Sequence, residues 1–323
     1  MKIAIYGYGN LGRGVELACR NHGVTVTGIF TRRNPETVVS YGAPVYSAER
    51  IYDMKGEIDV VILCGGSATD LPVTTPALAK DFCVVDSFDT HANIPTHFAK
   101  VDEVATKAQT TALISCGWDP GMFSIARTYA GAVLPQGQDY TFWGRGVSQG
   151  HSDAIRRIPG VLDARQYTVP KTEAVESVRK GENPTLTTRQ KHLRECYVAV
   201  AEGVDKTAVE TAIKTMPNYF ADYDTVVNFV TVEELKLNHA ELPHGGSVIR
   251  SGATGKNGEH KQVIEYSLKL DSNPEFTASV LVAYARAVHK LNQKGDYGCK
   301  TVLDISPADL SPLSKQDLLA HLL

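Results

Sequence analysis

Hydrophobic positions in the first third of the chain gather into short continuous runs of four to seven residues. We predict a strand for each run, at residues 2–6, 24–30, 60–63, 82–85 and 111–115. The stretches between them, such as residues 13–21 and 95–109, have helical character. Short buried strands that alternate with helices indicate βαβ units and a parallel sheet covered on both faces. The alternation stops near Gly117, so residues 1–118 are expected to form one doubly wound α/β domain.

The pattern changes after about residue 140, where longer runs alternate in polarity. The predicted strands of this part are residues 166–169, 196–200, 225–230 and 260–269, and the predicted helices are residues 173–180 and 206–215. This mixture is typical of an α+β domain with a mixed or antiparallel sheet, which we place at residues 119–273. An amphipathic helix over residues 276–293 follows Asn273-Pro274. We expect the region 274–323 to pack back on the first domain.

Composition and charge exclude several classes of protein. The 323 residues carry a formal net charge of −3 and no basic cluster, which argues against a nucleic-acid partner. No apolar run approaches the ~18–20 residues of a membrane span, and the first strand is too short for a signal peptide. We therefore expect a cytoplasmic protein. The six cysteines are scattered without a C-x-x-C pair, so neither a metal site nor a disulfide framework is expected.

A glycine-rich motif directly follows the first predicted strand. It reads Gly7-Tyr8-Gly9-Asn10-Leu11-Gly12 and matches G-x-G-x-x-G between a strand and a helix. Gly7 permits the tight turn, Gly9 lets a pyrophosphate approach the backbone, and Gly12 allows close packing of helix and strand. The first N–H groups of the helix then face the phosphates. The motif predicts a Rossmann domain that binds a dinucleotide; the alternative is a glycine-rich turn without a ligand.

The end of the second predicted strand indicates which dinucleotide binds. NAD-binding proteins usually carry an acid here for the ribose 2′-hydroxyl. This chain has Thr31-Arg32-Arg33 instead. Two guanidinium groups suit a 2′-phosphate, and Thr31 adds a hydroxyl donor. The position therefore predicts NADP as the cofactor, although an exposed basic loop is the alternative.

Small and polar residues follow the next two predicted strands. We expect the ribose and nicotinamide of the cofactor to lie over these strand ends, which are the usual site in such sheets. The residues concerned are Cys64, Gly65, Gly66, Ser67, Ala68 and Thr69 after one strand, and Ser87 and Phe88 after the other. Taken singly, each of these two segments can be an ordinary turn.

Several longer segments together resemble the meso-diaminopimelate dehydrogenase family over nearly the whole chain. They are YGYGNLG (residues 6–12), GIFTRR (28–33), GSATD (66–70), SCGWDPGMFS (115–124), TFWGRGVSQGHSDAIRRIPG (141–160), MPNYF (216–220), PHGG (243–246) and LDSNPEFTA (270–278). The resemblance implies reversible, NADP-dependent oxidative deamination at the D-centre of meso-2,6-diaminopimelate. The products are L-2-amino-6-oxopimelate and ammonia, on the diaminopimelate route to lysine. It also implies a homodimer whose second domain carries the subunit contacts.

The resemblance further assigns the substrate-binding residues. Near the reacting D-centre it places Asp89, Asp119, Trp118, Trp143, Ser148, Gln149 and Gly150. For the distal L-carboxylate it implies Thr168, Arg194 and His244, with Asn273 nearby. Asp153 supplies a further acid for a substrate that carries two ammonium groups. Arg194 suits a bidentate grip on a carboxylate.

The two aspartates Asp89 and Asp119 are the expected catalytic residues. We favour Asp119 for substrate orientation and proton transfer, with Asp89 as its partner; the sequence does not divide these roles. Structural interpretations remain for some of the residues: Trp143 can be core, and Asp119-Pro120-Gly121 is also a turn signal. Two other functions stay open, namely another NADP-dependent two-domain reductase of amino-acid biosynthesis and a non-catalytic NADP sensor.

Overall fold

The computed structural model describes all 323 residues and divides into two compact units. Unit 1 comprises Met1–Ile125 and Pro274–Leu323, and unit 2 comprises Ala126–Asn273. The division falls inside helix α4 (Met122–Val133), C-terminal to the boundary that we expected after Trp118. A continuous helix carries no change in composition, which is why the sequence has no signal at this place.

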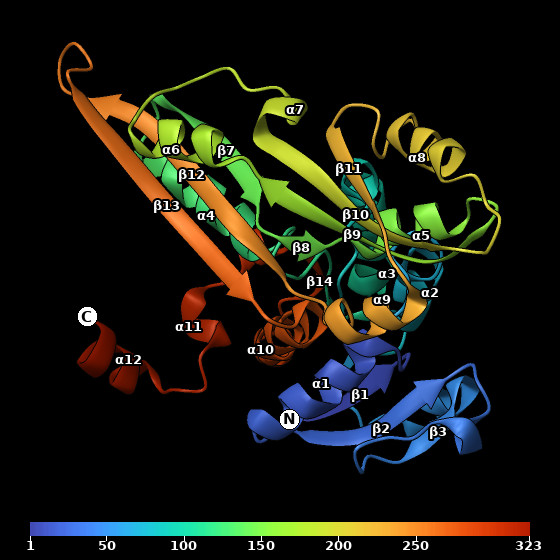
Figure 1. The fold of residues 1–323 in the computed structure, drawn as a ribbon. Helices are drawn as coiled ribbons and strands as arrows, with labels where there is room; N and C mark the ends of the chain where they lie inside the picture. Colours follow the sequence, from blue (N-terminus) through green and yellow to red (C-terminus); the bar gives the residue numbers. More distant parts are fainter. The chain divides into compact units, whose positions relative to one another are not determined.

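Unit 1 contains a seven-stranded parallel sheet with the order β14-β6-β5-β4-β1-β2-β3 (Figure 1). Its strands are β1 (Lys2–Tyr6), β2 (Thr25–Thr31), β3 (Val45–Ser47), β4 (Val60–Leu63), β5 (Val84–Asp86), β6 (Thr111–Leu113) and β14 (Gly298–Lys300). The five predicted strands are present with small shifts at their ends. The strands β3 and β14 were not predicted, because their sequences, VYS and GCK, contain no continuous apolar run.

Helices cover both faces of this sheet, which confirms the doubly wound α/β fold. Alternate residues of β1 divide between two cores: Ile3 and Ile5 pack with residues of α1 (Asn10–Asn21) and α10 (Asn273–Gln293), whereas Ala4 packs on the other face. The helices α2 (Leu71–Leu78) and α3 (Ile94–Ala108) lie on that second face. The remaining elements of unit 1 are short: η1 (Pro35–Thr37), η2 (Ala48–Met54), η3 (His91–Asn93), η4 (Val302–Asp304), α11 (Pro307–Leu310) and α12 (Lys315–Leu322).

Unit 2 contains a four-stranded mixed sheet with the order β11-β10-β9-β8. Its strands are β8 (Gly146–Val147), β9 (Val161–Pro170), β10 (His192–Val200) and β11 (Asp224–Phe229); the pair β10–β11 is parallel and the others are antiparallel. One face packs against α5 (Gln149–Arg156) and α8 (Lys206–Lys214) around Cys196, Val198 and Phe220. The helix α9 (Val232–Asn238) contacts β9 and β10. The mixed sheet of the α+β prediction is therefore present.

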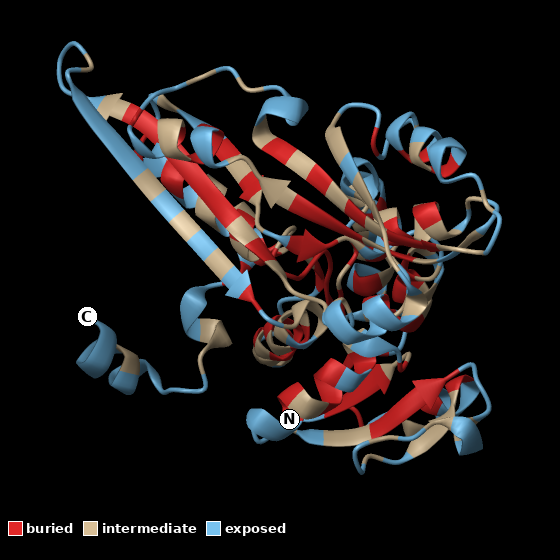
Figure 2. Ribbon diagram, viewed as in Figure 1, coloured by how far each residue is buried: buried red, intermediate tan, exposed pale blue.

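A second sheet of unit 2 has three antiparallel strands in the order β13-β12-β7. They are β7 (Gly137–Trp143), β12 (His244–Thr254) and β13 (His260–Leu270), and α6 (Thr172–Arg179) contacts β12. The short α7 (Thr188–Lys191) lies between α6 and β10 in the chain and contacts both. The central strand β12 was not predicted, since its glycines obscure any alternation. Gly245 has φ +125°, and a Cβ there would lie 2.2 Å from the carbonyl oxygen of Leu268. In Figure 2, most of β12 is buried, whereas the neighbouring edge strand β13 is largely exposed.

None of the helices combines the length and the apolar character that crossing a membrane requires.

Candidate active site

The glycine-rich loop of unit 1 has the geometry that a pyrophosphate requires. Gly7 has φ +95°, and a Cβ on Gly12 would lie 2.3 Å from the carbonyl oxygen of Gly7, so both positions need glycine. A Cβ on Gly9 would meet nothing within 4 Å, which leaves open space over the loop. Helix α1 begins there without a side-chain cap or an acid in its first turn. Its first N–H groups are thus available to an anion.

The side chain of Tyr8, a predicted cofactor residue, points into unit 1 instead. Its hydroxyl donates to the buried carboxylate of Glu16, which also accepts from the backbone N–H groups of Tyr41 and Ala43 at 3.1 and 2.9 Å. The carbonyl of Tyr8 accepts a hydrogen bond from the guanidinium of Arg33. Only the backbone of Tyr8 therefore belongs to the loop surface, and Glu16 is a structural partner that the motif did not reveal.

The three residues at the end of β2 have different environments. Thr31 is buried, and its hydroxyl accepts from the N–H of Arg33 at 3.1 Å. Arg32 and Arg33 are exposed but point to different loops, because Arg32 pairs with Asp70 at 2.8 Å. Asp70 in turn accepts from the N–H of Gly66, and this bond together with Arg32 lowers the pKa of its carboxyl. No acid follows β2 itself, as the sequence indicated.

The predicted residues after β4 and β5 are linked to each other. The hydroxyl of Ser67 accepts from the N–H of Asp89 at 2.8 Å and lies 3.3 Å from the hydroxyl of Thr90. Gly66, Ala68 and Thr69 are exposed, and Cys64, Gly65 and Ser87 are half-buried. Phe88 differs from its prediction, since its ring is buried in the core and stacks on His97 with centroids 4.3 Å apart.

A buried carboxylate that the sequence did not reveal organises these strand ends. Asp86 has no exposed surface and accepts from the N–H groups of Phe88 and Ser115 at 3.0 and 2.9 Å. Its second oxygen contacts the hydroxyl of Thr75 at 2.7 Å and Nε2 of His97 at 2.8 Å. Asp86 therefore fixes the segment that leads to Asp89 as well as the one that leads to Asp119.

Trp118 and Asp119 lie in a tight turn before α4. Trp118 is buried, forms a bridge with Gly121 and packs edge-on against Phe123 at 5.3 Å. A Cβ on Gly121 would lie 1.8 Å from the carbonyl oxygen of Gly117, so the turn admits only glycine there. Asp119 is half-buried and precedes a cis proline. The turn signal and the candidate catalytic position thus coincide.

In unit 2, the ligands expected for the distal carboxylate share one row of the mixed sheet. Gly146 of β8 pairs with Thr168 of β9, and Thr168 pairs with Arg194 of β10. The guanidinium of Arg194 donates to the hydroxyl of Thr168. The ring of His244 lies over Gly146, where a Cβ would be 2.6 Å from its Cγ. Paired residues of adjacent strands share a face, so these polar groups come together at one place.

Arg194 is buried without a negative partner. Its side chain is on the same face of β10 as the apolar Cys196 and Val198, and only 5% of the residue is exposed. Its Nε has no hydrogen-bond partner, and the groups that act on its charge are Tyr223 and Cys196 rather than a carboxylate. The guanidinium lies 3.8 Å from the ring centroid of Tyr223, and burial lowers its pKa. An unpaired buried cation is costly, which indicates a site for an anionic ligand.

Two histidines close to Arg194 are held neutral. Burial and the charge of Arg194 lower the pKa of both His151 and His192 to about 4. Nε2 of His192 accepts from the N–H of Trp143 at 3.0 Å, and the two rings stack with centroids 5.3 Å apart. His151 lies on α5, far from Arg194 in the chain, so no local pattern connects the two residues. His192 is two residues from Arg194 on β10 and shares its face, but the strand predicted from the sequence began only at residue 196. His192 thereby fixes the candidate substrate residue Trp143.

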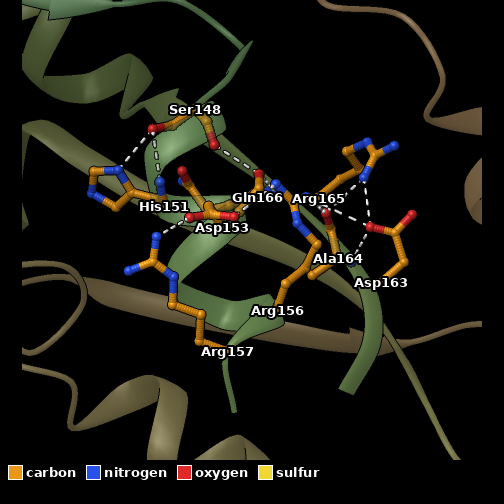
Figure 3. A network of polar contacts seen from close by, with 10 residues as sticks. Ser148, His151, Asp153, Arg156, Arg157, Asp163, Ala164, Arg165 and Gln166 are labelled. Atoms are coloured by element: carbon orange, nitrogen blue, oxygen red, sulfur yellow. Dashed lines mark hydrogen bonds and ion pairs between the residues drawn. The ribbon is translucent and has the colours of Figure 1, made fainter. Parts of the chain in front are cut away.

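The segment from Ser148 to Asp153 forms the start of α5 (Figure 3). Ser148 caps the helix, and its hydroxyl contacts Nδ1 of His151 at 2.7 Å. Gln149 and Gly150 are exposed in the first turn. The carboxylate of Asp153 is instead bound by Arg157 and lies 3.6 Å from Arg156. Asp153 therefore already has two cationic neighbours, and its contact with a substrate ammonium stays a prediction.

Asn273 is connected to the strand that carries His244. Its N–H donates to the carbonyl of Leu242 at 3.0 Å, and the carbonyl of the adjoining Pro243 accepts from Val147 at 2.9 Å. Pro243 thus links β8 to the start of β12, a role that the sequence did not suggest. The structure describes no group of three or more His, Cys, Asp or Glu side chains that could hold a metal ion.

Comparison with known proteins gives consistent results over the whole chain. A family described as "Diaminopimelic acid dehydrogenase C-terminal domain" matches residues 117–272. A meso-diaminopimelate D-dehydrogenase of Acetivibrio thermocellus is 58% identical, covering 100% of this chain and 98% of that protein. The one of Ureibacillus thermosphaericus is 57% identical, covering 100% and 99% respectively.

Solved structures agree with these relatives. A variant of the Clostridium tetani enzyme with six substitutions, solved with DAP, has a TM-score of 0.94 and 51% identity, covering 100% of this chain and 99% of that chain. The Corynebacterium glutamicum DAP dehydrogenase in complex with DAP has a TM-score of 0.92 and 46% identity over the same shares. An engineered D-amino acid dehydrogenase bound to NADP+ has a TM-score of 0.87 and 44% identity, again with these coverages.

Proposed function

The chain belongs to the meso-diaminopimelate D-dehydrogenase family, and on this premise we propose that it deaminates meso-2,6-diaminopimelate at its D-centre with NADP+. The products are L-2-amino-6-oxopimelate, ammonia and NADPH, and the reaction is reversible. This places the enzyme in diaminopimelate and lysine biosynthesis. We place it in the cytoplasm, where this route operates.

The buried guanidinium of Arg194 is the observation that carries the proposal. It has the charge, the hydrogen-bonding capacity and the uncompensated burial that a carboxylate ligand would satisfy. Thr168 and His244 add a hydroxyl and an imidazole at the same place. A sensor that binds only NADP has no need of such a group. We therefore assign Arg194, Thr168 and His244 to the distal L-carboxylate, with Asn273 as a further polar ligand.

The substituted Clostridium tetani variant supports this assignment. Its six substitutions replace a Gln, a Thr, an Arg, a Pro, a His and an Asn. The first five occur in this chain in the same order and at the same spacing, as Gln149, Thr168, Arg194, Pro243 and His244. The asparagine follows here after a slightly longer interval, as Asn273. Residues chosen for joint substitution in a relative solved with DAP are good candidates for substrate contacts.

At the reacting end we assign the ammonium group of the D-centre to Asp119 and Asp89 of unit 1, with Trp118 beside them. Trp143 of unit 2 is kept as a further substrate residue. Bound NADP+ supplies the hydride acceptor. One aspartate takes a proton from the ammonium group, so that the nitrogen lone pair assists loss of the hydride and an iminium forms on the substrate. An aspartate then takes a proton from a water molecule while the oxygen of that water attacks the iminium carbon. Collapse of this adduct gives the carbonyl and releases ammonia.

Unit 1 fits NADP through its own residues. The open space over Gly9 and the uncapped start of α1 suit the pyrophosphate. The absence of an acid after β2 and the presence of Arg32 and Arg33 suit a 2′-phosphate. We keep the remaining predicted residues after β4 and β5 as cofactor ligands, namely Cys64, Gly65, Gly66, Ser67, Ala68, Thr69 and Ser87. The buried side chains of Tyr8 and Phe88 act only as supports.

We also propose a homodimer. Tyr129 and Val133 lie one turn apart on α4 and are 68% and 57% exposed, which leaves an apolar stripe for a partner. Sedimentation equilibrium at micromolar concentration should give twice the mass of one chain. A monomer at these concentrations would contradict this part of the proposal.

The activity itself is tested by incubating the protein with NADP+ and meso-diaminopimelate and following the absorbance of NADPH. We expect turnover with the meso isomer, little with L,L-diaminopimelate, which has no D-centre, and much less with NAD+. Absence of turnover with meso-diaminopimelate, L,L-diaminopimelate and simple D-amino acids alike would reject the proposed reaction.

A further inference from the structure

An ion pair crosses the carboxyl end of β1, where the dinucleotide loop begins. Arg32 follows β2 and Asp70 follows β4, and β1 lies between these two strands in the sheet. Nη2 of Arg32 is 2.8 Å from Oδ1 of Asp70. The charges of both residues act on Tyr6, the last residue of β1. The pair therefore spans the loop that carries Gly7.

The carboxylate of Asp70 is a fixed partner in this pair. Its Oδ2 accepts from the N–H of Gly66 at 2.9 Å, and its own carbonyl accepts from the N–H and hydroxyl of Thr74, both at 2.9 Å. A Cβ on Gly65 would lie 2.8 Å from the Cβ of Asp70, so the loop is closely packed around it. Arg32 is the less enclosed member of the pair, since its side chain is 66% exposed against 24% for Asp70.

We infer that Asp70 is a specificity-determining residue of the cofactor site, which competes with the 2′-phosphate of NADP for the guanidinium of Arg32. This inference rests on the proposed function, because it needs a 2′-phosphate beside Arg32. When the phosphate binds, Arg32 either leaves Asp70 or holds both anions close together. Either outcome weakens binding of a nucleotide with a 2′-phosphate and leaves binding of one without a 2′-phosphate unaffected.

Arg33 differs in this respect. Its guanidinium donates to the carbonyl of Tyr8, which is a neutral acceptor, so no anion competes for its charge. The two neighbouring arginines thus differ in their partners. The charge of Arg33 is available to the 2′-phosphate, whereas Arg32 must exchange the carboxylate of Asp70 for the phosphate.

The experiment measures binding of adenosine 2′,5′-bisphosphate and of AMP by calorimetry at low salt, without substrate. In Asp70→Asn the amide oxygen still accepts from Gly66 while the charge is lost. We expect its Kd for the bisphosphate to fall about three- to tenfold, the size of one screened charge interaction. The Kd for AMP should change less than twofold. Asp53→Asn is the matched control, because it removes an exposed carboxylate of unit 1 beside Arg50.

Further measurements separate the outcomes. In an Arg32→Met background, Asp70→Asn should no longer tighten binding of the bisphosphate. The tightening should also shrink at high salt, where the charges are screened. An unchanged or weakened bisphosphate affinity in Asp70→Asn, or equal tightening of AMP, would overturn the inference. If that variant has a lowered Tm, Asp70→Ser replaces it, since its hydroxyl also accepts from Gly66. Wild-type protein that does not prefer the bisphosphate over AMP would instead reject the proposed cofactor.

Discussion

Arg194 shows how a single residue can favour binding at the expense of folding. Its guanidinium is buried against Tyr223 and bonded to Thr168, and no carboxylate offsets its charge. Desolvation of an unpaired charge opposes folding, whereas an arriving carboxylate regains that free energy in the complex. Asp153 is the opposite case, because Arg156 at the end of its helix and the following Arg157 already pair with its carboxylate.

Replacement of Arg194 by Met should therefore separate affinity from stability. Loss of the bidentate grip is expected to raise the KM for meso-diaminopimelate by about 100-fold, corresponding to ~3 kcal/mol of charge-assisted hydrogen bonds. The same change should raise the free energy of unfolding by about 1–3 kcal/mol, because an apolar side chain of similar length replaces a buried charge. Steady-state kinetics and urea unfolding measure the two effects.

The control for this prediction is Arg179→Met, which removes an exposed arginine paired with Glu265 and Glu176. It should leave the KM unchanged. The Kd for NADPH should stay the same in both variants. An unchanged KM in Arg194→Met would count against the distal carboxylate site, and lowered stability would show that the charge is compensated in a way the contacts do not reveal.

Among the elements, the junction of β1 and α1 contains two glycines with different roles: Gly9 is the N-cap of α1, and Gly12 lies in its first turn. A Cβ on Gly12 would meet the carbonyl oxygen of Gly7 at 2.3 Å, whereas one on Gly9 meets no atom. Gly12→Ala should therefore lower the stability of the fold by about 1–3 kcal/mol, as overpacking against rigid backbone does. Gly9→Ala should keep the wild-type Tm but weaken NADPH binding at least tenfold. Thermal unfolding and fluorescence titration test this pair, and equal effects of both variants on Tm would contradict it.

The contact between β7 and β10 makes unit 2 sensitive to acid. His192 has a pKa of about 4 in the folded chain, against an ordinary value near 6.5, because it is buried and lies close to the positive charge of Arg194. Between these two values the unfolded chain binds more protons than the folded one. The free energy of unfolding should thus fall by up to ~1.4 kcal/mol per pH unit for this histidine as the pH drops from 6.5 to 4, and His151 adds to the slope.

Urea unfolding of the wild type and of His192→Asn at pH 7.5 and 5.0 measures this dependence. The variant should be less stable at pH 7.5 but should lose less stability between the two values. His321→Asn, at an exposed position of α12, serves as the control. Identical losses in wild type and His192→Asn would show that His192 does not cause the acid sensitivity.

At the scale of the whole molecule, unit 1 is built from two distant parts of the chain. Helix α10 supplies Leu281, Ala285 and Val288 to the core that also holds Ile3 and Ile5. The strand β14 extends the sheet by pairing with β6. The first 125 residues therefore lack part of their own core, and the chain must return from unit 2 to complete it.

Truncation after Asn273 should consequently abolish folding of unit 1. We expect an aggregated product, or one without a cooperative thermal transition, because a large share of the apolar core is missing. Removal of α12 alone is the control, since none of its residues is buried and the Tm should hardly change. Solubility and differential scanning calorimetry report both results; a cooperatively folded fragment 1–273 that binds NADPH would contradict the prediction.

The features that could be predicted from the amino-acid sequence are those that depend on local order along the chain. The apolar runs, the glycine loop and the missing acid after β2 predict a Rossmann unit for NADP, because spacing and residue type decide each of them. The longer segments identified the family, and the comparisons confirmed it. The assignments of individual substrate residues stay predictions, now with a physical reason for Arg194, Thr168 and His244.

Features that depend on neighbours distant in the chain became visible only in the folded protein. The fold brings strands together and so decides whether the charge of an arginine has a negative partner. Arg32 has one in Asp70, whereas Arg194 has none. The pKa values of His151 and His192 follow from burial around Arg194. The glycine-rich strand β12 forms because two partners pair with it, which no local period records. Charge and hydrogen bonding act through space, so the sequence alone supplied the groups but not their partners.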